Sequence, residues 1–220
     1  MINSYKEKFV YTNYVVNNIE GIRFYNISDK LDVPSVTSIL KFTKYPDLVN
    51  PAYNRISDAM EIGNMMHMYL DYYVSKEDEY TPENKNFLIA KKLAQTVIDN
   101  CIMSLGEIWG TETPIHYKNQ YAGTIDLIGL HNDKLTIIDY KSSYRKKTDE
   151  EMQEYFLQLA AYAIAHDWQH GTSIESCLVF LSLRNGDFVK TVVSSDELKN
   201  LKNLWFERLD LFNKEYYKNA

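Results

Sequence analysis

The sequence predicts an α/β fold, a single domain in which a central mixed β-sheet is flanked by helices. Amphipathic helical patterns are followed by three strand patterns, a helix, two more strand patterns and a final helix, an order typical of helices packed on a mixed sheet. The 220 residues, of which 45% are hydrophobic and 25% charged, suit one ordinary globular domain. We expect residues 1–32 to form an N-terminal hairpin extension and residues 33–220 to form the core.

The N-terminal region alternates weakly between apolar and polar residues, and Glu20-Gly21 interrupts it. This pattern predicts a hairpin with strands of about 9–16 and 22–27. Nothing in it indicates chemistry.

A short helix is predicted after Pro34, where hydroxyl side chains precede an apolar pair. The free N–H groups of its first turn could receive a phosphate, with Ser35, Thr37 and Lys41 beside it. These residues alone favour ordinary helix capping over a phosphate site.

A longer helix is predicted over about 54–75, with His67 on its apolar face and Asp71 one turn further on. The other residues at helical spacing on that face are Ile56, Met60, Gly63 and Leu70. His67 is either a core histidine or part of a site. Gly63 costs about 0.5–1 kcal/mol relative to Ala in a helix interior, which suggests close approach of another backbone or of a substrate.

The next two elements are a helix opened by Pro82, over about 83–104, and a strand over about 107–117. The helix pattern is purely structural. Glu112, inside the strand, either joins an acidic cluster on the neighbouring strand or is a solvated strand residue.

The central hairpin is predicted to have strands of about 121–130 and 134–141 around the turn Asn132-Asp133. A two-residue turn pairs His131 with Lys134, and the same register places Asp126 opposite Asp139. Like charges in directly opposed positions destabilise a sheet.

Two carboxylates and an ammonium group share one face of this hairpin, because period-2 alternation puts Lys141 on the side of Asp139. A divalent cation between Asp126 and Asp139 would offset the repulsion, and hard cations such as Mg²⁺ prefer carboxylate oxygens. The alternative is a salt-bridged hairpin in which Lys141 neutralises a carboxylate.

The basic run Arg145, Lys146 and Lys147 follows the hairpin, where it could meet a phosphate backbone or simply be solvated. A helix over 149–168 then begins with a capping-box-like sequence. Gln158 and Tyr162 lie four residues apart on one face of it.

The chain ends with a hairpin of 177–183 and 188–193 around a glycine-containing turn, and a helix from Ser194 to about Tyr217. Its predicted buried side includes Leu204.

Charge and composition limit the function. A net charge of −6 argues against non-specific coating of nucleic acid but leaves room for a local basic groove. Aromatic rings for stacking are abundant, with 18 Tyr, 9 Phe and 3 Trp. Cys101 and Cys177 read as buried free thiols. Without a signal-like or membrane-spanning apolar run, we expect a soluble, cytoplasmic protein.

An ordered set of short motifs resembles the RecB-type branch of the PD-(D/E)XK nuclease superfamily, over about residues 33–165. Within it, the stretches around Ser35 and Asp126 are similar to the group of the mitochondrial genome maintenance exonuclease and its phage and bacterial relatives. The motifs are Gly63-x-x-x-His67-x-x-x-Asp71, Gly123-Thr-Ile-Asp126, Asp139-Tyr140-Lys141 and Gln158-x-x-x-Tyr162.

The resemblance implies that the metal is held by His67, Asp126, Asp139 and the carbonyl of Tyr140. Lys141 would orient the attacking water or stabilise charge on the phosphate.

Around that centre, the resemblance implies that Gln158 and Tyr162 support the site or touch DNA, and that Ser35 and Thr37 contact phosphate. Asp71 stands where the family more often has Glu, and Asp126 follows Thr-Ile where the superfamily pattern has Pro.

The implied activity is hydrolysis of DNA phosphodiester bonds by an exonuclease that uses one or two Mg²⁺ or Mn²⁺ ions. Its substrate would be single-stranded DNA or a DNA end, with low sequence preference. The alternatives are a catalytically silent DNA-binding or scaffold protein with the same fold, and an unrelated domain with a structural ion. Structural sites are usually closed by Cys and His at short spacing, which this sequence lacks.

Overall fold

A computed structural model of the chain describes residues 5–28, 31–45, 57–76 and 84–218. Its centre is a five-stranded sheet in the order β4-β5-β6-β7-β8. The pair β6–β7 is parallel and the other pairs are antiparallel, so the predicted mixed sheet is confirmed. The strands are β4 (Ile108–Tyr117), β5 (Tyr121–His131), β6 (Lys134–Ser143), β7 (Ser176–Leu183) and β8 (Phe188–Val193).

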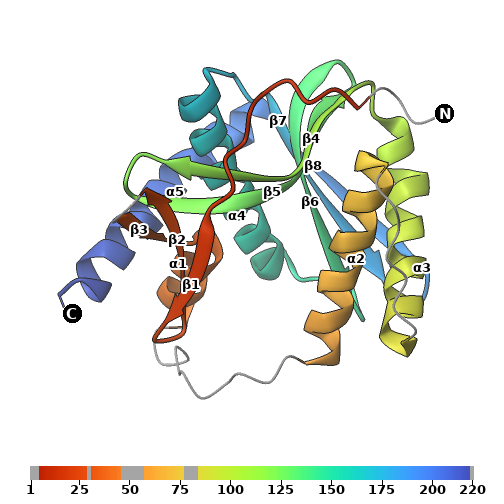
Figure 1. Cartoon of the computed structure of the whole chain (residues 1–220), viewed down its shortest axis with the longest axis horizontal. Helices are drawn as coiled ribbons and strands as arrows, with labels where there is room; N and C mark the ends of the chain where they lie inside the picture. The colour runs from red at the N-terminus through yellow and green to blue at the C-terminus, as the bar shows by residue number, and fades with distance from the viewer. Residues whose placement is uncertain (1–4, 29–30, 46–56, 77–83, 219–220) are drawn as a thin grey trace.

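Helices cover both faces of this sheet (Figure 1). The helices are α1 (Val36–Lys44), α2 (Asp58–Ser75), α3 (Lys85–Asn100), α4 (Asp149–His170) and α5 (Ser195–Tyr216). Ile138 and Tyr140 pack in one core cluster with α2 and α3, whereas Leu135 and Ile137 pack in another with α1, α4 and α5. The predicted period-2 alternation of β6 is therefore confirmed.

The N-terminal region forms the predicted hairpin around Glu20-Gly21, with the second strand as expected, but its first strand is shifted and a third strand is added. It forms a three-stranded sheet of β1 (Val15–Ile19), β2 (Ile22–Ser28) and β3 (Leu31–Pro34). The predicted first strand of 9–16 is wrong because Phe9 and Tyr11 pack their rings against His166 of α4, with centroids 5.2 and 6.1 Å away. Tertiary packing of aromatic side chains overrides the weak alternation.

Helix ends also differ from the sequence patterns. The predicted helix of 83–104 begins at Lys85, because the Asn84 side chain accepts from the N–H groups of its first turn. It ends at Asn100, and a separate 3₁₀ turn, η2 (Ile102–Ser104), follows. Pro82 and the predicted start of α2 at residue 54 lie outside the described residues; Ser57 caps α2.

The buried faces of two helices are also corrected. In α2 the core residues are Ile62, Met66, Leu70 and Val74. Met60, predicted on that face, is 57% exposed, and in α5 Leu204 is 40% exposed. Both side chains lie just outside an apolar stripe that is narrower than the pattern indicated.

Cys101 and Cys177 are buried and free, as predicted. Among the described residues, no helix is both long and apolar enough to cross a lipid bilayer.

Candidate active site

The predicted register of the central hairpin is confirmed. Asn132 and Asp133 have φ of 51° and 61°, the left-handed values of a type I′ turn, and the ladder runs from His131–Lys134 to Leu127–Ile138. Beyond the pair Leu127–Ile138, the Asp126 side chain makes the contact between the two strands: its Oδ2 accepts the Tyr140 N–H at 2.7 Å. The side chain of Asp126 is thus locked to the strand that carries Asp139.

Glu112 lies in the acidic cluster and is not a solvated strand residue, the other environment that the sequence allowed. It lies between the paired residues Thr111 and Thr113 with a φ of 45°, an unfavourable conformation for a non-glycine residue. Its Oε1 is 3.3 Å from Nδ1 of His67. The distortion of β4 therefore aims Glu112 at the hairpin.

His67 of α2 contacts residues of the three neighbouring strands β4, β5 and β6. Its Nδ1 is 3.4 Å from Asp126 Oδ1, and its Nε2 donates to the carbonyl of Tyr140 at 3.0 Å. The possible ligand atoms of His67, Glu112 and Asp126 all lie within 4.8 Å of one another. These residues could hold a metal ion.

Asp139 is engaged separately, on the side of α4. Gln158 Nε2 donates to its Oδ1 at 2.7 Å and also reaches the Tyr162 hydroxyl at 3.1 Å. The Lys141 ammonium group lies 2.7 Å from the Asp139 carboxylate. A chain of contacts from Tyr162 through Gln158 therefore fixes this carboxylate.

The ionisation of the site reflects burial and crowded charge. Burial raises the pKa of Asp139 to about 6, despite Lys141 beside it. Burial alone would lower the pKa of His67, but the carboxylates of Asp126 and Glu112 raise it well above its usual value. Burial and the charge of Asp126 raise the pKa of Glu112, against the effect of His67.

The other two charged groups are stabilised in their ionised forms. Burial would raise the pKa of Asp126, but His67, Lys141 and the Tyr140 N–H outweigh it and lower that pKa. Burial would lower the pKa of Lys141, but the carboxylates of Asp139 and Asp126 raise it. Lys141 is therefore a cation at neutral pH.

A cavity of about 630 Å³ opens over these residues. The predicted site residues on its wall are Ser35, Thr37, His67, Glu112, Asp126, Tyr140, Lys141, Gln158 and Tyr162. Gly63 also lines it, and the nearest atom to a Cβ there would be Ser142 Oγ at 3.8 Å. Among the residues that the structure describes, no backbone of another segment comes within 4 Å of that Cβ position, so of the two predicted reasons for Gly63 the approach of a substrate is the one that its place on the cavity wall favours.

Arg23 and Tyr25 of β2 also line the cavity, although no sequence pattern indicated them. Long-range contacts hold β2 beside β5, among them the isolated β-bridge of Ser35 with Ala122 and the Tyr25 hydroxyl, which lies 3.3 Å from Thr124 Oγ1. Met60, which is not part of the core, lines the same cavity.

The predicted DNA-binding residues occupy three different environments. Ser35 is buried and caps α1 by accepting the Ser38 N–H. Arg145 and Lys147 make ion pairs with Glu151, whereas Lys146 is exposed. Lys41 is exposed and lies outside the cavity that holds the acidic cluster.

The donor set fits a divalent cation. Carboxylate oxygens, one imidazole and a backbone carbonyl converge at the cluster, a combination that suits Mg²⁺ or Mn²⁺. Asp139 Oδ2 is buried and makes no hydrogen bond among the described residues, although Lys141 lies close to it. Such an atom retains lone pairs for a cation.

A mixed sheet whose central hairpin carries a buried Asp and an Asp-x-Lys, beside a histidine from a covering helix, defines a nuclease class. A family model described as the PD-(D/E)XK nuclease superfamily matches residues 44–214. The chain belongs to the PD-(D/E)XK nuclease superfamily.

Two further comparisons lead to proteins named as exonucleases. The chain is 29% identical over 111 residues to the mitochondrial genome maintenance exonuclease 1 of Xenopus tropicalis, covering 47% of this chain and 31% of that protein. It thus spans less than a third of that relative. A solved structure from Eubacterium rectale, provisionally named an exonuclease, has a TM-score of 0.49 at 11% identity, covering 82% of this chain and 81% of that one.

Proposed function

We propose that the protein is a metal-dependent exodeoxyribonuclease that hydrolyses single-stranded DNA, or DNA with a free end, with low sequence preference. One observation carries the proposal: His67, Glu112, Asp126 and Lys141 line one open cavity, and the buried Asp139 lies directly behind it, 2.7 Å from the Lys141 ammonium group. The exonuclease assignment is further supported by the name of the similar Xenopus protein.

His67, Glu112, Asp126 and the carbonyl of Tyr140 would hold Mg²⁺ or Mn²⁺, and Asp139 would contribute Oδ2, the oxygen that Lys141 also approaches at 2.7 Å. When bound, such an ion polarises a phosphate and lowers the pKa of a coordinated water. Glu112 extends the ligand set that the sequence suggested, because its side chain reaches His67.

Lys141 would act on the reacting phosphate. Its ammonium group is anchored by Asp139 and its side chain remains 21% exposed towards the cavity. A fixed cation at this position stabilises negative charge that develops on the phosphoryl oxygens, and it can also orient the attacking water. Gln158 and Tyr162 hold Asp139 and so fix the ammonium group indirectly.

The substrate would enter beside the first turn of α1. Thr37 is exposed there and its hydroxyl lies 3.2 Å from that of Ser35, so both it and the free N–H groups of the helix can receive a phosphate. The rings of Tyr25 and Tyr72 line the same cavity. Stacking on rings and contacts to the backbone tolerate any sequence.

The test is degradation of 5′- and 3′-labelled single-stranded and duplex DNA with Mg²⁺, Mn²⁺ or EDTA. Wild type, Lys141→Ala and the control Lys199→Ala, an exposed lysine on α5, are compared. We expect metal-dependent loss of label for wild type and the control only, with product lengths that give the polarity. DNA binding without cleavage under every condition would favour the non-catalytic alternative.

A further inference from the structure

A second hollow adjoins the catalytic cavity. It has a volume of about 280 Å³ and shares Thr37 and Gln158 with that cavity. Its walls are the C-terminal half of α1 and the N-terminal half of α4. The basic side chains that line it are Lys41, Lys44 and Lys147. The two hollows therefore adjoin at Thr37 and Gln158.

Two tyrosine rings face this hollow. Tyr45 is 49% exposed and its ring lies 5.6 Å from the Lys44 ammonium group. Tyr155 lies deeper, and the Lys141 ammonium group is 5.2 Å from the centre of its ring. Tyr155 thus touches the proposed catalytic lysine from the side of the second hollow. Rings and lysines together are the features that bind single-stranded nucleic acid without sequence preference.

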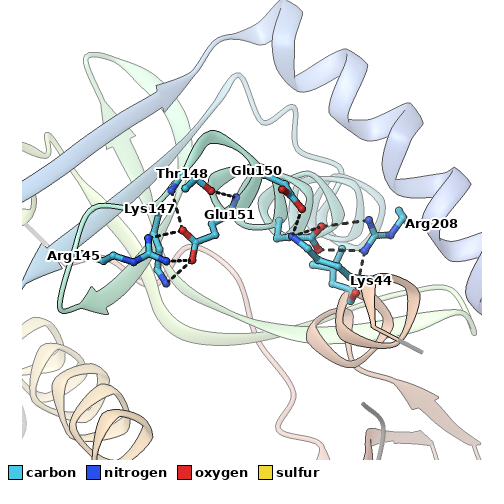
Figure 2. A network of polar contacts seen from close by, with 9 residues as sticks. Lys44, Arg145, Lys147, Thr148, Glu150, Glu151 and Arg208 are labelled. Atoms are coloured by element: carbon cyan, nitrogen blue, oxygen red, sulfur yellow. Dashed lines mark hydrogen bonds and ion pairs between the residues drawn. The ribbon is translucent and has the colours of Figure 1, made fainter. Parts of the chain in front are cut away.

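At the rim of the hollow, hydrogen-bond donors surround the Glu151 carboxylate (Figure 2). We call these donors, from Arg145, Lys147 and the Thr148 N–H, the cradle. The Arg145 guanidinium group donates to both of its oxygens, at 2.7 and 2.9 Å. Lys147 adds a contact at 3.2 Å, and the Thr148 N–H adds one at 2.9 Å. A forked guanidinium group with a backbone N–H at a helix N-terminus is the arrangement that binds phosphate oxygens.

The charges leave this cradle cationic. Arg145 and Lys147 carry +2 against the −1 of Glu151, so +1 remains. Glu154, the other carboxylate on the wall, is already paired with Arg208 and Lys44, and Lys44 also lies 3.5 Å from Glu150 (Figure 2). These two cations and two carboxylates balance, so the local positive charge of the hollow comes from the cradle and from the exposed Lys41, on a chain whose net charge is −6.

We propose that this hollow binds the nucleotides of single-stranded DNA that flank the catalytic cavity, and that the Glu151 carboxylate occupies the position of a backbone phosphate. The inference rests on the proposed nuclease function and extends it to the path of the strand. Tyr45 and Tyr155 stack bases, while Lys41 and the cradle meet phosphates. Glu151 lies at the surface, with 31% of its side chain exposed, so solvent screens its contacts and a phosphate can exchange with it.

The test compares Glu151→Gln with wild type in binding a fluorescent oligodeoxynucleotide, by anisotropy in EDTA over a range of salt concentrations. Gln at this position keeps the capping box of α4 while removing the charge. The matched control is Glu197→Gln, since Glu197 occupies the same position in the first turn of α5. Circular dichroism confirms that each variant is folded.

We expect Glu151→Gln to tighten binding by up to about fivefold, the equivalent of about 1 kcal/mol. The slope of log K against log salt should steepen by about 0.7 for each additional phosphate that the protein neutralises. Glu197→Gln should match wild type. An unchanged affinity and slope for Glu151→Gln, with wild type binding and cleaving DNA, would overturn the strand path and leave the nuclease function standing.

A second comparison tests the rings. Tyr45→Ala should weaken binding by about fivefold or more, because stacking contributes about 1–3 kcal/mol per base. Tyr217→Ala, which removes another exposed tyrosine at the end of α5, should not. If Tyr45→Ala bound DNA with wild-type affinity, the proposal that the strand passes through this hollow would be refuted. Failure of wild type itself to bind or cleave DNA would overturn both proposals.

Discussion

Gly123→Ala should damage the active site without touching any charged residue. A Cβ at Gly123 would lie 2.5 Å from Cε1 of Tyr162 and 3.2 Å from its Cζ. Tyr162 cannot swing away freely, since it is 4% exposed and its hydroxyl accepts from Gln158. The ring must shift, and Gln158, which holds Asp139 at 2.7 Å, must shift with it.

The magnitude follows from overpacking of a buried ring, which typically costs about 1–3 kcal/mol. In a domain of this size each kcal/mol lowers the Tm by about 2–4 °C. A displacement of about 1 Å in a catalytic group can cost about a hundredfold in rate, so we expect kcat to fall by about tenfold to a hundredfold. Thermal unfolding and single-turnover cleavage of labelled DNA measure the two effects.

Gly63→Ala is the matched control, because it changes the other glycine on the cavity wall. Its Cβ would meet only Ser142 Oγ, at 3.8 Å, and in a helix interior the change should stabilise by about 0.5–1 kcal/mol. The double variant Gly123→Ala/Tyr162→Leu should recover part of the lost stability. Wild-type stability and rate in Gly123→Ala would refute the reasoning that the Tyr162–Gln158–Asp139 chain positions the site.

Three further predictions concern single groups. Asp139→Asn should abolish cleavage in the gel assay while circular dichroism stays native; wild-type cleavage would contradict its assigned role. Thr37→Val should weaken DNA binding in anisotropy by about 1.5–3 kcal/mol, the scale of a hydrogen bond to a charged group, whereas unchanged binding with slower chemistry would count against a phosphate contact. Burial and the charge of His170 lower the pKa of His166 to about 3, so the stability that neutral His166 confers is full above its unfolded pKa of about 6.5 and is lost as the pH falls. Between about pH 6.5 and 5, wild type should lose about 1.5–2 kcal/mol more than His166→Gln in urea unfolding, and equal losses would refute this account.

The central hairpin could be predicted from sequence because each determinant is local. A two-residue turn fixes the register, and the register fixes which side chains share a face. The shared face of Asp139 and Lys141 on β6 therefore follows from spacing, whereas the predicted backbone pair of Asp126 with Asp139 is replaced by the contact of the Asp126 side chain with the Tyr140 N–H. The helix caps at Ser35 and Thr148 are local for the same reason, and both are found.

The features that sequence could not supply depend on distant partners. The sequence allowed two environments for Glu112. The choice between them depends on the positive φ of Glu112, which turns its side chain towards the distant residue His67. Arg23 and Tyr25 reach the cavity through a sheet whose packing no local pattern encodes. The basic run at 145–147 suggests free charge, but Glu151 pairs with both Arg145 and Lys147.

Two departures from regular sheet pairing meet at the acidic cluster, and together they explain how the site is built. Glu112 takes a positive φ where β4 should pair with Asp126, and Asp126 uses its side chain on the Tyr140 N–H where β5 should continue its ladder with β6. An unfavourable backbone conformation costs about 1–3 kcal/mol and persists only where the surroundings impose it. Here it leaves Glu112 directed at His67 and leaves Asp126 anchored by one oxygen while the other faces His67. A regular sheet would point the two side chains where strand alternation dictates, so the interruption of pairing is what assembles the candidate metal ligands.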